Sequence, residues 1–522
     1  MARGAQPVIR HWPGALAAAL VVALALGTLA AVALRAEGWT ALQSADWAAV
    51  RFTLLQATLS ALFSVGLALP VARALARRQF PGRRALVTLM GAPFILPVIV
   101  AVLGLLAVFG RNGLISHILG VFGLPPIHIY GLHGVVLAHV FFNLPLATRL
   151  ILHGWLSIPG ERFRLAASLG FGPRETFRLL ELPMLRAVLP GAALVIFLIC
   201  TTSFAVALAL GGGPRATTVE LAIYQAFRFE FDLGHAALLG LVQVAICATA
   251  AALARGASLP AEMGGGLDRA VQRWDAGATQ LKLIDAIATC LAAAFLLTPL
   301  GAVVADGLAG ITRLPGAVLW AAGRSLAVAL AAAALTLALA LPLAVFIHNA
   351  GRAGSALAET VAYLPVATSP LVIGVGLFIV IFPFADPVSL ALPVTALVNA
   401  VMSLPFVMRA ILPALTEAEA AYGRLADSLG MKGLTRLRIF LLPRLARPLG
   451  FATGLAAALS AGDLGVVALF VDPAEATLPL YLYQLMASYR MEEAAGAALV
   501  LLALSLGLFV AFDRGGRLGA QA

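Results

Sequence analysis

Long apolar runs alternate with short polar segments along the whole chain, and many runs are as long as a membrane is thick. About twelve of them reach roughly 20 residues, the length that a helix needs to cross the hydrocarbon core of a bilayer. The pattern predicts an all-α polytopic membrane protein. The expected spans lie near residues 15–35, 54–76, 86–109, 133–155, 186–210, 234–254, 284–305, 317–347, 356–383, 388–412, 446–470 and 494–512.

Composition supports this class and excludes an ordinary soluble domain. Of 522 residues, 61% are hydrophobic and only 11% are charged, and the mean hydropathy is +0.99. The three cysteines, Cys200, Cys247 and Cys290, all lie in apolar stretches without metal-ligand spacing. We therefore expect neither a metal site nor a disulfide framework.

The positive charge is distributed unevenly between the two predicted sides of the membrane. With the N-terminus inside, 27 lysines and arginines lie in inner segments and 8 in outer segments. The positive-inside rule then places both termini in the cytoplasm. The net charge of +11 needs no nucleic-acid partner, because the arginines face anionic lipid and the cytoplasm.

The chain repeats itself at about half its length. Residues 139–186 align without a gap to residues 399–446, with 15 identities in 48 positions. The expected organisation is two tandem six-helix halves in the same orientation. We place the first half at 1–255, with its core at about 50–255. A cytoplasmic linker occupies 256–283, and the second half occupies 284–522, with its core at about 317–513.

The repeated segment contains a polar loop between two spans. Gly170 and Gly430 each follow a helix-forming stretch, at the position where a left-handed residue ends a helix. Thirteen residues later, Pro183 and Pro443 lie where the next span begins, a position that tolerates the missing N–H. The pattern predicts two helix–turn–helix feet below the membrane. We interpret them as two equivalent docking points for a soluble partner.

The spacing of this loop resembles the "EAA" loop of type I ABC importer permeases, which fits a groove on each ATPase subunit. Gly170 and Gly430 match the family glycine, and the pairs Leu182–Pro183 and Leu442–Pro443 match its ending. The family glutamate is replaced by arginine in both copies. The coupling residues that this resemblance implies are Arg164, Ala166, Gly170, Leu182 and Pro183, with Arg424, Ala426, Gly430, Leu442 and Pro443.

The chain shows no ATP-binding motif of its own. It has two lysines, Lys282 and Lys432, and neither follows a glycine as a P-loop requires. We expect no catalytic residues and no cofactor bound by this chain. ATP and Mg²⁺ would belong to a separate ATPase subunit, with two copies for the two feet.

The whole chain resembles the fused permeases of bacterial thiamine ABC importers. The resembling stretches are 139–145, 210–225, 462–470 and 480–484. The resemblance implies an inner-membrane permease that imports thiamine, with the phosphate esters of thiamine as further candidates, delivered by a periplasmic binding protein. Fused permeases for ferric iron share the fold and the feet and remain an alternative. An ion-coupled secondary transporter of twelve helices is a less favoured one.

Four polar residues inside the spans are candidates for a substrate path. Asp463 lies deep in the eleventh span, and Ser203 is its repeat partner; His139 and Asn399 form a second repeat pair. A carboxylate at the membrane centre costs about 2.5–3.5 kcal/mol on insertion scales, so we do not expect Asp463 to face lipid. It could attract a cationic substrate, or it could only join helices by hydrogen bonds. Both interpretations remain open for all four residues.

Two outer segments are candidates for docking the binding protein. Each follows a predicted span, contains glycine or proline, and leads into an amphipathic helix with a Tyr–Gln pair. Such loops often carry binding residues. The candidates are Gly212, Pro214, Tyr224 and Gln225 in the first half, and Tyr483 and Gln484 in the second.

Overall fold

The computed structural model describes residues 12–36, 38, 42–91, 95–213, 216–254, 279–470, 472 and 475–519. Within these residues the chain is helical and contains no strand, which confirms the all-α class. Eleven described helices are long and apolar enough to cross a membrane, and Pro370–Ile381 is a shorter apolar helix. The protein is therefore a multi-pass membrane protein, and the count of twelve spans is approximate.

The first half runs from α1 to α13. A π-helical turn, Ala23–Gly27, joins its first two helices. The helices are α1 (Trp12–Val22), α2 (Thr28–Arg35), α3 (Ser44–Arg77), α4 (Arg83–Leu89), α5 (Val98–Phe109), α6 (Leu114–Val121), α7 (Leu132–Leu156), α8 (Gly160–Ser168), α9 (Pro173–Thr176), α10 (Leu182–Thr201), α11 (Phe204–Leu210), α12 (Val219–Arg228) and α13 (Leu233–Ala254).

The second half begins at α14, and the predicted linker at 256–283 lies mostly outside the described residues. Its helices are α14 (Thr279–Gly310), α15 (Ala317–Asn349), α16 (Arg352–Tyr363), α17 (Pro370–Ile381), α18 (Ala391–Ser428), α19 (Gly433–Thr435), α20 (Leu442–Ala461), α21 (Gly465–Phe470), α22 (Leu478–Ala487) and α23 (Met491–Gly519).

Four expected spans are interrupted, where a continuous helix was expected. The spans at 86–109 and 356–383 break before Pro97 and Pro370, because proline cannot continue a helix and restrains the residue before it. The spans at 186–210 and 446–470 break after Thr201 and Ala461. Interrupted backbone at membrane depth is tolerated only where protein or a water-filled cavity surrounds it.

The two halves share hydrogen bonds as well as sequence. In the first half, Thr53 Oγ1 of α3 accepts a bond of 2.9 Å from the first N–H of α12, at Val219. In the second half, Ser325 Oγ of α15 accepts one of 2.8 Å from the first N–H of α22, at Leu478. These bonds satisfy N–H groups that a helix start leaves without an internal partner. The repeat thus positions α12 and α22 in the same way.

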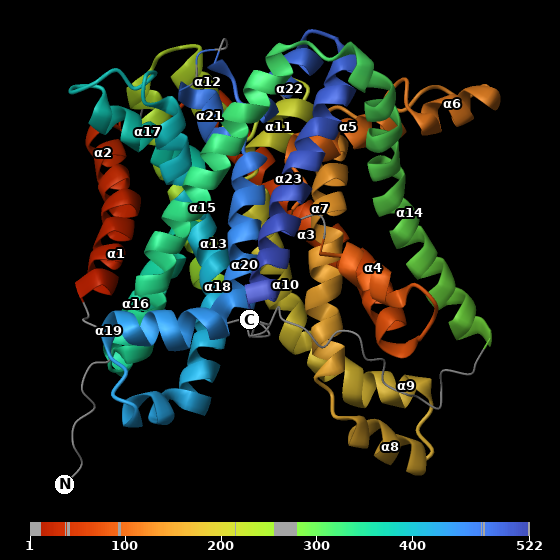
Figure 1. The fold of residues 1–522 in the computed structure, drawn as a ribbon. Helices are drawn as coiled ribbons and strands as arrows, with labels where there is room; N and C mark the ends of the chain where they lie inside the picture. The colour runs from red at the N-terminus through yellow and green to blue at the C-terminus, as the bar shows by residue number, and fades with distance from the viewer. Residues whose placement is uncertain are drawn as a thin grey trace.

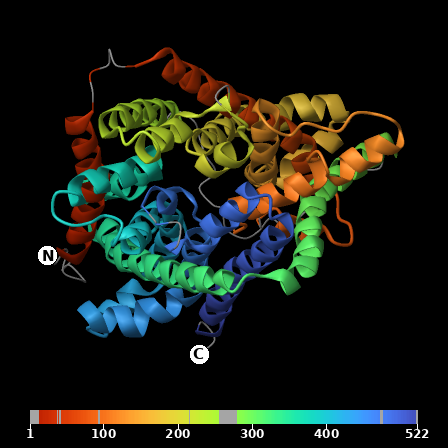
Figure 2. The same cartoon turned by 90° about the horizontal axis from the view of Figure 1, so that it is seen from above.

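The first helices of the two halves each contact both halves. Helix α1 packs on α15, and α2 packs on α17 as well as on α13 of its own half. Helix α14 packs on α3 and α5 of the first half as well as on α23 of its own. Small residues allow this close approach: a Cβ on Gly376 would lie 2.6 Å from Thr28, and one on Gly104 would lie 2.6 Å from the Pro299 carbonyl. Figure 2 shows α14 crossing to the first-half side and α1 next to the second-half helices. Each half is therefore packed against at least one helix of the other half.

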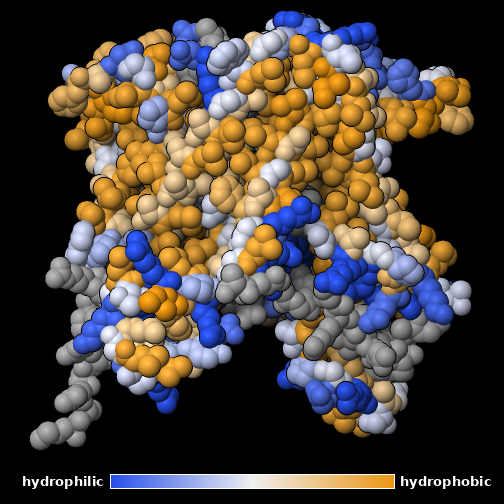
Figure 3. Space-filling view, viewed as in Figure 1, coloured by the Kyte–Doolittle hydropathy of each residue, from blue (hydrophilic) through white to orange (hydrophobic). Residues whose placement is uncertain are grey.

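The molecule has two distinct ends along the helix axes. The feet, built from α8–α9 and from the end of α18 with α19, project as separate lobes on one side (Figure 1). Helix α1 begins and α23 ends toward that same side. In Figure 3 a broad apolar band covers the middle of the visible face, with polar side chains above it and around the feet. This band has the character expected of a lipid-facing surface.

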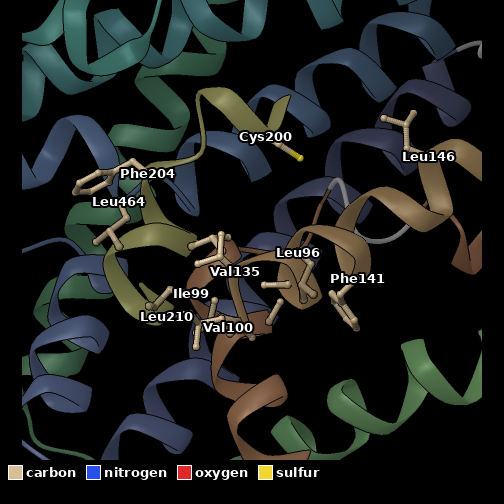
Figure 4. Packing of buried hydrophobic residues seen from close by; sticks show 14 of the residues in the cluster. Leu96, Ile99, Val100, Val135, Phe141, Leu146, Cys200, Phe204, Leu210 and Leu464 are labelled. Carbon is tan, nitrogen blue, oxygen red and sulfur yellow. The ribbon is translucent and has the colours of Figure 1, made fainter. Parts of the chain in front are cut away.

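The core between the halves forms around the interrupted helices. Figure 4 shows Phe204, the first residue of α11, close to Leu464, which lies just before α21. Both side chains are buried, at 5% and 2% exposure. A Cβ on Gly462 would lie 3.0 Å from Pro97. The interruption in the second half is therefore packed directly on the first half.

Candidate functional site

Each foot turns at its glycine through the same motif. Gly170 has φ of +68° and Gly430 has φ of +67°, as the sequence predicts for residues that end a helix in the left-handed region. The N–H of Met431 bonds the carbonyl of Ala426 at 3.0 Å, and the N–H of Gly430 bonds that of Asp427 at 3.0 Å. The first foot repeats both bonds between its own residues. These pairs form the Schellman motif and confirm the predicted turn.

After the turn, each foot continues into the membrane through a π-helical segment. These segments are Phe177–Glu181 and Arg436–Leu441, and each is followed directly by α10 or α20. Pro183 and Pro443 lie in the first turn of these helices, as predicted. The chain before each proline is helical, as the predicted helix–turn–helix foot requires, but its π-helical form was not predicted. The wider π turn accommodates proline, which lacks an N–H and clashes with the preceding turn.

The feet expose apolar side chains at repeated positions. Leu165 and Leu169 of the first foot are 60% and 61% exposed, and Leu425 and Leu429 of the second are 58% and 63% exposed. They are four residues apart, so each pair shares one side of its helix. Arg164 and Arg424 beside them are exposed, whereas Ala166 and Ala426 are buried against the rest of the foot. Exposed apolar patches rimmed by charge are typical of protein interaction sites.

The second foot has an internal ion-pair cluster that the first lacks. Arg436, whose side chain is 3% exposed, pairs with Glu419 and Asp427 of α18 and lies over the Phe440 ring at 5.6 Å. The repeat partner of Arg436 is Thr176, which bonds the Gly172 carbonyl at 2.9 Å. The cluster joins the two arms of the second foot. Sequence reasoning missed it, because its members are 8 to 17 residues apart.

The first foot is attached to the membrane helices by a different ion pair. Glu181 Oε2 lies 3.0 Å from Arg73 Nε of α3, and the Glu181 side chain is fully buried. Arg73 also lies 5.5 Å from the centre of the Phe177 ring. The repeat partner of Glu181 is Leu441, which packs in an apolar cluster of the second half. At equivalent positions, the first foot is therefore held by an ion pair and the second by apolar packing.

Asp463 lies in the interruption between α20 and α21. Its Oδ1 accepts the N–H of Gly465 at 3.2 Å, while its Oδ2 is buried without a hydrogen-bond partner among the described residues. A Cβ on Gly465 would lie 3.8 Å from Phe204 of the first half. The carboxylate therefore lies at the interface between the halves and has an unfilled hydrogen-bonding capacity.

The other three path candidates are only partly brought together. Asn399 Nδ2 donates to Ser460 Oγ at 3.0 Å, and its amide is near enough to interact with Asp463. His139 is 3% exposed and its Nδ1 lies 3.3 Å from Ser60 Oγ, within the first half. Ser203 is half-buried and precedes α11, the position equivalent to Asp463. The described contacts group Asn399 with Asp463, whereas His139 bonds a neighbouring helix.

The docking candidates lie on α12, α22 and the loop before α12. Gly212 is exposed with φ of +75°, and Pro214 lies outside the described residues. Tyr224 is half-buried, with its ring 5.1 Å from Phe204 and 5.7 Å from Phe229. The remaining candidates are half-buried as well: Gln225, Tyr483 and Gln484.

Two further outer residues share an unusual backbone. Phe231 and Tyr489 follow α12 and α22, have φ of +55° and +58°, and are 71% and 91% exposed. Bulky residues rarely adopt this conformation, which costs energy and often marks functional positions. Their aromatic character at corresponding positions was the sequence signal that could have identified them.

One cavity of the described part has none of the four path candidates in its lining. It has a volume of about 640 Å³ and lies between α3, α7 and α14. Its lining is apolar apart from His133, and several lining residues, such as Phe63 and Leu291, are exposed toward the expected lipid. A lining of this kind suits acyl chains better than a polar substrate.

Comparison with known proteins identifies the family. The sequence is 41% identical over 470 residues to the thiamine transport system permease protein of Brucella abortus (strain 2308), covering 89% of this chain and 87% of that protein. It is 40% identical over 533 residues to the thiamine transport system permease protein of Escherichia coli (strain K12), covering 98% of each. The chain belongs to this thiamine transport permease family. The resemblance to fused two-half permeases is thereby confirmed.

The likeness extends more weakly to permeases with other cargo. A probable sulfate transport system permease protein of Helicosporidium sp. is 30% identical over 195 residues, covering 37% of this chain and 72% of that protein. No protein-family model matches the chain. The relatives that cover most of the chain are named as transport permeases.

Proposed function

We propose that this chain is the permease of an ATP-driven importer that carries thiamine across the bacterial inner membrane. The observation that carries the proposal is the identity of about 40% to thiamine transport permeases over nearly the whole chain. A thiamine phosphate ester is a further candidate cargo. Ferric iron is less favoured, because the relatives that cover most of the chain are named for thiamine. An ion-coupled transporter would leave the two feet without a role.

Two copies of an ATPase subunit would dock on the two feet. Leu165 with Leu169, and Leu425 with Leu429, offer two matching apolar contacts flanked by arginine. ATP and Mg²⁺ would be held by the ATPase, and this chain would bind no cofactor. The feet lie in the cytoplasm in this proposal, as do both termini, and a periplasmic binding protein would dock at the opposite end, on α12, α22 and their loops.

The transport mechanism would be alternating access. Closure of the ATPase pair would move the feet, and the halves would then part on one side of the membrane and close on the other. Asp463 supports a path at the interface between the halves, because its unfilled oxygen could meet the positive charge of the thiazolium ring. Such an interaction would attract the cation without binding it tightly enough to prevent release.

The test is uptake by the reconstituted complex. Proteoliposomes would contain the permease with its ATPase, with the binding protein and labelled thiamine outside and ATP inside. We expect thiamine accumulation that requires ATP, with competition by unlabelled thiamine and none by ferric iron. Competition by thiamine monophosphate or diphosphate would extend the cargo to the esters. ATP-independent uptake, or uptake of iron alone, would refute the proposal.

A further inference from the structure

A buried carboxyl group lies outside the sites described so far. Glu220 is on α12, which lies outside the membrane-spanning helices, and its side chain is 0% exposed. Neither of its carboxyl oxygens makes a hydrogen bond of normal geometry among the described residues. A buried ionised carboxylate without partners is strongly unfavourable, so the group usually becomes neutral instead.

The groups around Glu220 indicate how it is satisfied. Gln243 of α13 and Ser369 before α17 are close enough to interact with its carboxyl group. Gln243 Nε2 already donates to the Thr201 carbonyl at 2.9 Å, while its Oε1 is buried without a partner. Ser369 Oγ accepts from the N–H groups of Leu371 and Val372, which leaves its own O–H to donate.

One proton on Glu220 would complete this set of bonds. The protonated carboxyl group can donate its O–H to Gln243 Oε1, and its other oxygen can accept from the Ser369 hydroxyl. Burial also raises the pKa of Glu220 to about 8, although Ser369 and Gln243 each lower it. The group is fully buried and neither carboxyl oxygen has a hydrogen-bond partner among the described residues, so we expect it to be neutral here.

The position of the cluster connects protonation to the arrangement of the halves. Glu220 and Gln243 belong to the first half, and Ser369 belongs to the second. The same interface holds Phe227 of α12 against Phe378 of α17, with ring centres 4.8 Å apart. At an offset of 259, the positions of Glu220 and Gln243 are taken by Pro479 and Leu502. The second half therefore does not repeat this cluster at the equivalent positions.

We propose that Glu220 is a protonation site that holds its proton while α12 and α17 are in contact and releases it when the halves part. Parting would remove Ser369 and admit water, which would restore an ordinary acidity to the carboxyl group. Because the closed state binds more protons, a rise in pH favours the parted state. The effect falls between about pH 4.3, the ordinary value for glutamate, and about pH 8.

Other titratable groups lie on the helices packed against α12. His235 of α13 pairs with Asp46 of α3 at 3.1 Å. Arg51 lies on α3, Cys247 on α13, and Tyr224 and Arg228 on α12 itself, whereas α11, α17 and α21 contribute no charged group. A variant at Glu220 is therefore needed to separate its response from that of these other groups.

The inference rests on the proposed alternating access and can be tested by distance measurements. Spin labels would replace Phe229 and Phe382, which are exposed at the ends of α12 and α17, in a Cys290→Ser background. The permease–ATPase complex would be measured in lipid nanodiscs from pH 6 to pH 9. We expect the parted fraction to rise with pH, by at most about tenfold per unit in the parted-to-closed ratio.

Glu220→Gln should remain closed across this range, because the amide mimics the neutral acid in shape and can donate to Gln243. Glu230→Gln, at an exposed glutamate of the same segment, is the matched control and should titrate like the unaltered protein. A pH-independent distance in the unaltered protein would overturn the inference. So would an unchanged titration in Glu220→Gln, which would assign the response to another group such as His235.

A second measurement, with nucleotide at constant pH, distinguishes failure of this inference from failure of the proposed function. ATP with vanadate at constant pH should change the label distance if the halves alternate. If nucleotide moves the labels and pH does not, the protonation site is wrong and the proposed mechanism is supported. If pH moves them and nucleotide does not, the halves part but not under the control of ATP, so the ATP-driven step of the proposed function is wrong and the protonation site is supported.

Discussion

At the scale of single residues, the feet depend on backbone conformation more than on space. A Cβ added to Gly170 or Gly430 would meet nothing within 4 Å, yet both residues have φ near +67°. A side chain would therefore fit, but the left-handed conformation costs roughly 1–2 kcal/mol for residues other than glycine. The cost is smaller for asparagine, because its short polar side chain can form a hydrogen bond with the nearby backbone.

We expect Gly170→Val and Gly430→Val to uncouple ATP hydrolysis from transport while leaving membrane insertion intact. A β-branched residue at positive φ would change the angle between the two arms of a foot. The measurement is binding-protein-stimulated ATPase activity and uptake in proteoliposomes. Gly430→Asn is the matched control and should retain most coupling. Unchanged stimulation and uptake in both valine variants would exclude a coupling role for the turn.

Asp463→Asn should impair thiamine uptake and preserve both the fold and the basal ATPase rate. The amide oxygen can still accept the Gly465 N–H, so the bond at 3.2 Å survives while the charge is lost. Uptake would be normalised to folded protein in the membrane. Lower yield or thermal stability would indicate a structural role, since buried groups that lose partners destabilise the protein. Normal uptake by a well-folded variant would exclude attraction of the cation.

At the scale of elements, the two feet have one shape but different supports. The second is braced internally by Arg436, which joins α18 to the π-helical segment, and the first is attached to α3 through Glu181 and Arg73. Breaking a buried ion pair by removing one partner costs about 3–5 kcal/mol, because a charge is left unpaired. The two feet should therefore respond independently to loss of their own supports.

Arg436→Met should loosen the second foot and leave the first unchanged. It leaves Glu419, which is 10% exposed in its side chain, without its partner, whereas Asp427 is mostly exposed and matters less. Hydrogen exchange of residues 419–441 should become at least about 100-fold faster, which corresponds to roughly 3 kcal/mol. Arg438→Met, at an exposed arginine of the same segment, is the control. Equal exchange in both variants would contradict a bracing role.

At the scale of the whole molecule, orientation and assembly have different origins. The excess of arginine on the side of the feet predicts a cytoplasmic location for that end, which is still to be tested. The contacts that α1–α2 and α14 make with the other half depend on close helix packing at glycine, such as Gly376 on Thr28. Each half thus contributes a helix to the stability of the other.

Cysteine labelling from each side tests the orientation. Cysteines at Phe80 and Thr435 should react only from the cytoplasm, and cysteines at Arg111 and Glu475 only from the periplasm. The background should carry Cys290→Ser, because Cys290 is the exposed native cysteine of the described part. An impermeant maleimide applied to intact spheroplasts and to inverted vesicles gives the readout. Labelling of position 435 from outside would reverse the topology.

The sequence by itself determined the class, the approximate spans, the repeat and the turns of the feet. These are local properties. The hydrophobicity of an apolar run and the backbone freedom of a glycine after a helix depend only on the local sequence. The same reasoning predicted that Asp463 would not face lipid, and it lies at the interface between the halves, although its role in transport is still a prediction.

Only the tertiary structure decided which helices are interrupted and which residues meet. A run containing Pro97 or Pro370 reads as one span, because the neighbouring helices that satisfy the freed backbone groups are distant in sequence. Glu220 and Ser369 likewise lie 149 residues apart, on different halves, and nothing local to either indicates the other. Periodicity identifies the buried face of a helix, but packing between helices determines what that face contacts.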